Sequence, residues 1–153
     1  MIIERFSLNA QDSVERASRL AVRKNQAYVT PWHLIDGMLR QDDSRAANFL
    51  NRAGVDVKAL SGRVDAHLLS QKKALKGAQE TPINRELERV FMSAEDFADG
   101  LGSKYIGIGH LILGLLEIDE VLEAMTECGL DKEALELLLK KAPAGGYGSD
   151  EAS

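Results

Sequence analysis

The sequence predicts an all-α fold, in which two tandem four-helix repeats pack as a pseudo-twofold, eight-helix domain. The main observation is a duplication: Tyr28–Leu39 (YVTPWHLIDGML) returns 77 residues later as Tyr105–Leu116 (YIGIGHLILGLL), and six of the twelve positions are identical. Apolar residues also recur at the spacing of amphipathic helices through most of the chain. Aromatic residues make up only 5% of the chain, whereas Leu and Ala are plentiful, which favours helices over strands.

Composition excludes several classes of protein. With 153 residues, 44% hydrophobic and 28% charged, the chain suits one globular domain with a working core. Its net charge of −5 and pI near 5.2 argue against a nucleic-acid partner, which needs a basic face. The single Cys128 cannot form an internal disulfide and fits a reducing compartment. No apolar run reaches the roughly 18 residues of a membrane span, so we expect a cytoplasmic protein without a membrane partner.

The first copy begins with two capped helices. Ser7 is a plausible N-cap for a helix that runs to about Lys24, and residues 25–29 form a loop. Thr30 and Pro31 restart a helix, because a hydroxyl can cap it and the missing N–H of proline costs nothing at its first position.

Two shorter helices complete this copy. After a polar break at 41–44, a third helix ends at Gly54, which is placed to adopt the left-handed conformation of a C-terminal stop. Asp56 caps a fourth helix that runs through Leu68. The polar stretch that follows, QKKALKGAQET, is typical of a linker.

The second copy repeats this plan. Asn84 leads into a helix that ends near Gly100, and the repeated HLILGLL stretch forms the next one. Asp119 is expected to cap the seventh helix. Asp131 is expected to cap the eighth, which ends near Lys141.

The alignment of the two copies extends over nearly the whole chain. Gly54 falls on Gly129 with an offset of 75, because the second copy is two residues shorter in this part. Gly37 and Gly114 lie inside paired helices, where glycine costs about 1 kcal/mol against alanine, so we expect another helix to approach closely there. A duplicated unit of this kind usually forms a groove at its seam. The expected domain is 1–141, with a first repeat at about 7–70, a linker at 71–83, a second repeat at about 84–141 and a flexible tail at 142–153.

The sequence nominates no active site and no cofactor. It has neither a phosphate-binding loop nor a dinucleotide fingerprint. His33 and His110 hold paired places and could converge on a metal, but no acid or cysteine recurs beside both. We therefore prefer histidines that bond nearby backbone at the helix starts. Cys128 pairs with Ala53 across the copies, which indicates a packing site rather than a nucleophile, and the acids of the fifth helix are best explained as a solvated face.

An interaction surface is the remaining possibility. Four apolar residues flank the repeated helices, and the pattern leaves open whether they form a buried seam or an exposed groove: Val29, Trp32, Ile106 and Ile108. An exposed groove with a polar rim would bind extended or unfolded peptide segments.

These features resemble the N-terminal repeat domain of the ring-forming Clp ATPases, the ClpA, ClpB and ClpC unfoldases. The resemblance rests on both copies of the Y-[IV]-G-x-E-H-L-L-x-[AG]-L-L motif, on the paired helix ends at Ala53–Asp56 and Cys128–Asp131, and on the opening ERFSLNAQDSVERA, which is similar to a ClpB start. It covers residues 1 to about 141. It implies an eight-helix pseudo-dimer that recognises substrates or adaptors for an ATP-driven unfoldase.

The resemblance also implies a substrate surface near the second repeat. Ser7, Phe91 and His110 match family positions implicated in holding unfolded protein, with Tyr105 and Ile106 as their neighbours. An acid precedes the motif histidine in many members, whereas Trp32 and Gly109 stand there in this chain. In ClpC-like members those acids bind phosphoarginine, which is therefore not expected. The replacement should make the surface more apolar, which adds Trp32 to the expected substrate-binding residues.

Three functions remain open after this comparison. The first is a module that captures unfolded or aggregated polypeptides for a parent or partner Clp ATPase hexamer. The second is a free-standing protein or docking module that binds a folded adaptor and regulates such an ATPase. The third is a small helical enzyme, for which the sequence offers no catalytic residues.

Overall fold

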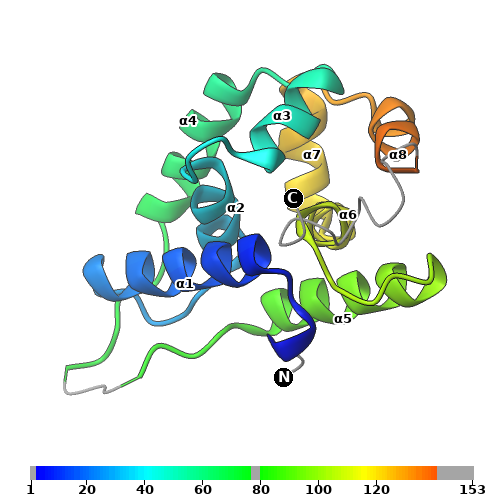
Figure 1. Ribbon diagram of the computed structural model, residues 1–153. Coiled ribbons are helices and arrows are strands. Elements are labelled where there is room, and N and C mark those ends of the chain that lie inside the picture. Colours follow the sequence, from blue (N-terminus) through cyan, green and yellow to red (C-terminus); the bar gives the residue numbers. More distant parts are fainter. Residues whose placement is uncertain (1–2, 77–79, 141–153) are drawn as a thin grey trace.

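The computed structural model describes residues 3–76 and 80–140 and confirms the all-α prediction (Figure 1). Within these residues, isolated β-bridges are the sole extended pairing, and a short 3-10 turn, Ile3–Arg5, precedes eight α-helices. The expected tail at 142–153 lies outside the described residues. The helices are α1 (Leu8–Arg23), α2 (Pro31–Leu39), α3 (Arg45–Arg52), α4 (Val57–Leu69), α5 (Arg85–Gly100), α6 (Ile108–Leu115), α7 (Asp119–Glu127) and α8 (Lys132–Lys140).

The helices form two matching sets. In Figure 1, α1 and α5 lie along one side of the domain, while α4 and α8 lie at its opposite ends. The main contacts within the repeats join α1 to α2 and α5 to α6. Most contacts between the repeats come in pairs as well, since α1 meets α6 as α2 meets α5, and α3 meets α8 as α4 meets α7, while α3 also meets α6. This pairing is what a pseudo-twofold axis produces.

The capping residues fix where these helices begin. The side chains of Ser7, Asn84 and Asp56 accept the backbone N–H groups three residues on, with N···O distances of 3.2, 2.9 and 3.0 Å. Asp131 does the same at 3.1 Å. The predicted cap at Asp119 is wrong: Ile118 is the N-cap residue, and Asp119 is the first helical residue. There its carboxylate stabilises the positive end of the helix dipole instead of closing a hydrogen bond.

Each repeat is held by the segment that precedes the other. Phe6, before α1, forms a parallel bridge with Ile106, while Ile83, before α5, forms the equivalent bridge with Val29. The backbone N–H of Ser7 donates to the carbonyl of Ile106 at 3.0 Å, and its counterpart in Asn84 donates to Val29 at 2.9 Å. The end of the predicted linker therefore belongs to the fold.

A second pair of backbone hydrogen bonds joins the repeats, between the segment that follows α3 and the segment that follows α7. The N–H of Asp56 donates to the carbonyl of Cys128 at 2.8 Å, and the N–H of Asp131 donates to that of Ala53 at 2.9 Å. Between them Gly54 and Gly129 adopt φ values of 97° and 109°, as expected for glycine stops. The structure thus confirms the prediction that Gly54 and Gly129 end equivalent helices in the two repeats.

The predicted close approach at the paired helix glycines is confirmed. A Cβ atom on Gly37 would lie 2.6 Å from the carbonyl oxygen of Ser13, and one on Gly114 would lie 2.5 Å from that of Val90. α2 and α6 can therefore pack directly onto the backbones of α1 and α5. All four apolar residues beside the repeated helices are buried, which decides for a seam rather than a groove at these positions: Val29, Trp32, Ile106 and Ile108.

Candidate functional site

Most residues expected to bind substrate lie together at one junction between the repeats. Ser7 caps α1 beside Ile106, and the rings of Phe6 and Phe91 of α5 pack at 72° to each other with their centroids 5.4 Å apart. Ser7, Phe91, Ile106 and His110 are buried, however, and Tyr105 alone among these residues is half-buried. The junction holds the repeats together, and a direct contact of its residues with a substrate stays a prediction.

The expectation that Trp32 and Gly109 make the surface more apolar is wrong. Trp32 is only 5% exposed, because its indole ring stacks on the imidazole of His67 with ring centroids 3.7 Å apart and planes at 5°. His67 is half-buried in this stack. Gly109 is buried in the first turn of α6. Neither residue adds an exposed apolar surface.

The two motif histidines have the structural role that the sequence indicates. Nδ1 of His33 accepts the N–H of Thr30 at 3.0 Å, and Nδ1 of His110 accepts that of Gly107 at 3.0 Å. Nε2 of His33 also lies 2.7 Å from Oε1 of Gln26. Burial lowers the pKa of each histidine to about 4, so both rings are neutral near pH 7.

An open groove lies elsewhere, between α5, α6 and α8 of the second repeat. This α5–α6–α8 groove has a volume of about 370 Å³. Its apolar lining comes from α5, α6 and their C-cap residues, with Leu113 and Leu116 buried, Phe97 half-buried and Leu101 45% exposed. The remaining lining residues surround this apolar centre: Asp96, Gly100, Glu117, Lys132, Glu136 and Lys140.

The fourth helices of the two repeats pack differently. In the first repeat α4 packs closely on α2. In the second repeat the described part of α8 packs mainly on α3, across the repeat boundary. The C-terminal end of α5 supplies the other wall, where Gly100 presents no side chain and Leu101 projects as the C-cap residue.

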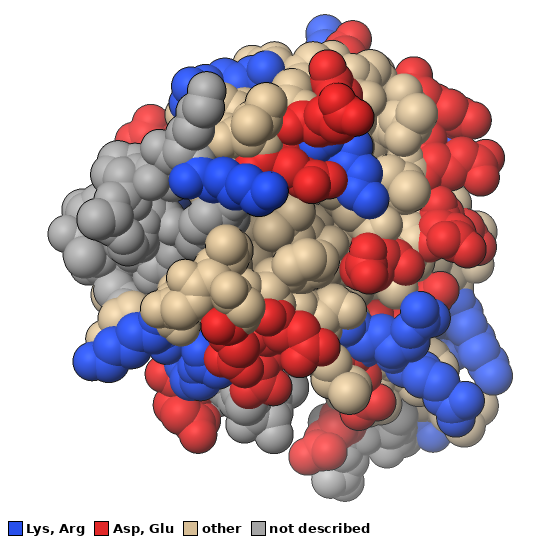
Figure 2. Space-filling view, turned by 90° about the vertical axis from the view of Figure 1, so that its right-hand side faces the viewer, with Lys and Arg blue, Asp and Glu red and all other residues tan. Residues whose placement is uncertain are grey.

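Charged side chains border the apolar centre. Figure 2 faces the side of the domain formed by α8 and the end of α5, and shows uncharged surface hollowed between acidic and basic side chains. None of the ion pairs formed among the described residues uses the three acids at the rim, which come from α5, the end of α6 and α8: Asp96, Glu117 and Glu136.

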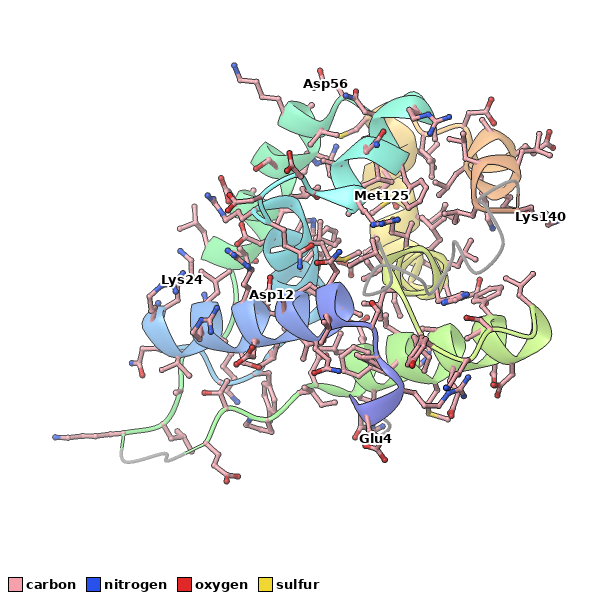
Figure 3. The ribbon with its side chains drawn as sticks, in the orientation of Figure 1. Glu4, Asp12, Lys24, Asp56, Met125 and Lys140 are labelled. Atoms are coloured by element: carbon pink, nitrogen blue, oxygen red, sulfur yellow. The ribbon has the colours of Figure 1, made fainter. Side chains whose placement is uncertain are left out.

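The first repeat has the same groove with a different surface. This α1–α2–α4 groove has a volume of about 360 Å³, and it is lined by Leu20, Arg23, Lys24, Asp36, Arg40, Asp65 and Leu68. At paired positions, Lys24 replaces Leu101, Asp36 replaces Leu113 and Arg40 replaces Glu117. Nε of Arg40 donates to Oδ1 of Asp36 at 2.9 Å, so these charges satisfy each other. In Figure 3, Lys24 and Lys140 mark the two grooves at opposite sides of the domain.

Sequence reasoning missed this pair of grooves. The signal was present in the aligned copies, where three leucine or glycine positions of the second repeat carry charged residues in the first. It could be used only once the structure placed the ends of α5 and α6 beside α8.

The described residues give no evidence for a metal site or a membrane span. They contain no group of three His, Cys, Asp or Glu side chains placed to bind a metal ion. Of the acids on α5, Glu95 and Asp99 pair with the guanidinium of Arg5 at 3.5 and 2.9 Å. Among the described helices, none is both long and apolar enough to cross a bilayer.

Comparison with known proteins identifies the family. The family model for the Clp repeat (R) N-terminal domain matches residues 5–128, which include all of both motif copies and the junction. The chain belongs to the Clp repeat N-terminal domain family. A curated relative, the chaperone protein ClpB of Clostridium tetani, is 28% identical over 120 residues, which are 76% of this chain and 14% of that protein. The Clp repeat domain therefore spans about one seventh of the length of this relative.

Solved structures share the double-repeat fold. The Hsp104 N-terminal domain from Candida albicans superposes with a TM-score of 0.78 and 18% identity, covering 89% of each chain. A ClpV N-domain solved in complex with a VipB peptide superposes with a TM-score of 0.63 and 16% identity, covering 91% of this chain and 79% of that one. Clp N-domains of several kinds thus share this arrangement of eight helices.

Proposed function

We propose that this Clp repeat domain is the polypeptide-recognition module of an ATP-dependent Clp chaperone, and that it holds apolar segments of unfolded or aggregated protein in the α5–α6–α8 groove. The observation that carries the proposal is an open groove with an apolar centre in a domain of this family. The ATPase hexamer would be the remainder of the parent protein or a partner. A cytoplasmic location fits this role.

The geometry supports weak and adaptable binding. Leu101 and Phe97 offer apolar area at the surface, while Leu113 and Leu116 form a floor that a side chain can reach only from one side. A shallow groove of this size buries little area, and an unfolded segment loses entropy when it is ordered. Low affinity suits a module that must release what it delivers.

Docking of a folded adaptor is the second candidate. It is favoured by the structural neighbour that was solved as a complex of a ClpV N-domain with a VipB peptide, because a defined protein partner binds there. The two candidates predict different results in a competition experiment with unfolded protein. An adaptor should stay bound in the presence of an excess of unfolded protein, whereas two unfolded segments should displace each other.

The test replaces the groove surface with its counterpart from the first repeat. Gly100→Arg with Leu101→Lys introduces the residues found at Arg23 and Lys24. A Cβ on Gly100 meets nothing within 4 Å, and Leu101 is 45% exposed, so the fold should be retained. The matched control is Val22→Lys, which adds a lysine at an apolar position that is 63% exposed and lines neither groove.

Binding is measured by fluorescence anisotropy with a reduced, alkylated protein that cannot fold. We expect saturable binding to the wild-type domain and to the control, and binding at least about tenfold weaker to the groove variant, which corresponds to about 1.4 kcal/mol. Equal binding by all three proteins would exclude the groove as the site. Absence of saturable binding to the wild-type domain would exclude capture of unfolded protein.

A further inference from the structure

We propose that the α5–α6–α8 groove selects apolar segments that are flanked by lysine or arginine, and disfavours the same segments flanked by acids. This inference rests on the proposed function and adds the chemical class of the bound segment. It comes from the charges that border the groove and from their contrast with the first repeat.

The acids of the rim are available to a ligand. Asp96 and Glu117 are exposed, Glu136 is half-buried, and none of the ion pairs formed in the described part of the chain involves them. Because they come from α5, from the turn after α6 and from α8, they border the apolar centre from different elements rather than forming one patch. A segment whose apolar side chain enters the groove would bring its neighbouring residues close to these carboxylates.

Two lysines also line the groove, and both belong to α8. Lys132 lies in the first turn of this helix and Lys140 at its last residue, so they stand at the two ends of one wall. The lining still has a net charge of −1, from three acids and two lysines. The acid on α5 and the acid after α6 belong to other walls of the groove than the two lysines.

The charge around the groove has the same sign. Residues 84–140 contain 13 Asp and Glu against 5 Lys and Arg, a net charge of −8, whereas residues 7–70 contain 7 against 9, a net charge of +2. The two repeats share one fold, but their net charges differ by ten units. A field of this sign raises the local concentration of basic segments and rejects acidic ones, and salt screens both effects.

The twin groove shows that the acidic rim does not follow from the fold. The position of Glu117 is occupied by Arg40 in the first repeat, and the position of Asp96 by Arg19. Acids at these places therefore belong to the groove that also has the apolar centre. Complementary charges at the border of an apolar site add mainly selectivity, since each exposed pair contributes little affinity.

The experiment uses three labelled peptides with one central sequence, Leu-Phe-Leu, flanked on both sides by two lysines, two serines or two glutamates. Their affinities are measured at about 0.05 M and about 0.5 M salt. At low salt we expect the lysine-flanked peptide to bind about tenfold more tightly than the glutamate-flanked one, with the serine-flanked peptide between them. At high salt the three affinities should converge.

A charge reversal locates the selectivity. Asp96→Lys with Glu117→Lys should invert the order of the three peptides at low salt. The matched control, Glu120→Lys with Glu123→Lys, makes the same change in net charge on α7, outside the groove lining, and should keep the order. Inversion in the control as well as in the rim variant would overturn the assignment to the rim.

The outcomes separate this inference from the proposed function. If all three peptides bind equally at low salt and Gly100→Arg with Leu101→Lys abolishes their binding, the charge selectivity is wrong while the groove remains the site. If none of the peptides binds and the unfolded protein does not bind either, the proposed function fails, and the inference fails with it.

Discussion

The two grooves of this domain have one architecture and two surfaces. Each lies between the first, second and fourth helix of its repeat, and their volumes are about 370 and 360 Å³. The groove of the second repeat is apolar at its centre, whereas the groove of the first repeat carries the ion pair between Asp36 and Arg40 along α2. The duplication thus has two equivalent sites, and only one of them has a surface with an apolar centre.

The scaffold beneath the grooves has diverged much less. Paired glycines admit the close helix contacts, paired histidines bond the same backbone groups, and paired bridges exchange the leading segments. Residues that hold the repeats together therefore recur in both copies, while residues that line the grooves differ. Substitutions at paired positions should therefore change stability equally where the two copies carry the same residue, and unequally where the residues differ.

The largest expected difference lies in the two leading segments. Phe6 is buried against Phe91, whereas its counterpart Ile83 is half-buried. We expect Phe6→Ala to lower the free energy of unfolding by about 4 kcal/mol and Ile83→Ala by about 1 to 2 kcal/mol. Urea unfolding followed by circular dichroism measures both. Equal losses would show that the two segments contribute alike in spite of their different burial.

The paired histidines should give equal pH effects. Since burial lowers each folded-state pKa to about 4, below the ordinary 6.5, the unfolded chain binds protons that the folded domain does not. The free energy of unfolding therefore falls as the pH drops from 6.5 to about 4, by about 3 kcal/mol for each histidine. Above pH 6.5 this loss is absent.

Unfolding free energies at several pH values between 7 and 4 check this expectation. His33→Gln and His110→Gln should each flatten the pH dependence by a similar amount. A variant that leaves the slope unchanged would show that its histidine already accepts a proton in the folded domain.

The paired glycines should show the smallest of these losses. Gly37→Ala and Gly114→Ala would each place a Cβ atom about 2.6 and 2.5 Å from a backbone carbonyl oxygen, which cannot move away cheaply. We expect each substitution to cost about 2 kcal/mol. The control is Gly62→Ala in α4, where a Cβ meets nothing within 4 Å and the domain should gain up to about 1 kcal/mol. Thermal melts of the three variants distinguish a clash from a general effect of alanine.

The fold could be predicted from the sequence because its signals are local and occur twice. Capping residues such as Ser7 and Asn84, and the glycine stops, act on their own helices and need no tertiary information. The error at Asp119 has the same origin, since an acid favours the first turn as well as the cap.

The site could not be predicted in the same way, because exposure depends on where distant helices lie. Trp32 was expected to add apolar surface, but the ring of His67 covers it, and nothing in the local sequence around Leu101 shows that it lines a groove. Both the seam and the centre of the groove are apolar, so the sequence pattern does not separate them. The packing of the helices shows which residues are buried and which line the groove.

The central claim is that a bound segment occupies the groove of the second repeat and not its twin. Methyl NMR with labelled leucines tests it directly, since Leu101, Leu113 and Leu116 line one groove while Leu20 and Leu68 line the other. On titration with the lysine-flanked peptide, we predict that the methyl signals of Leu101, Leu113 and Leu116 shift in a saturable way. The methyl signals of Leu20 and Leu68 should stay in place. Shifts at Leu20 and Leu68 of equal size, or shifts confined to them, would contradict the account.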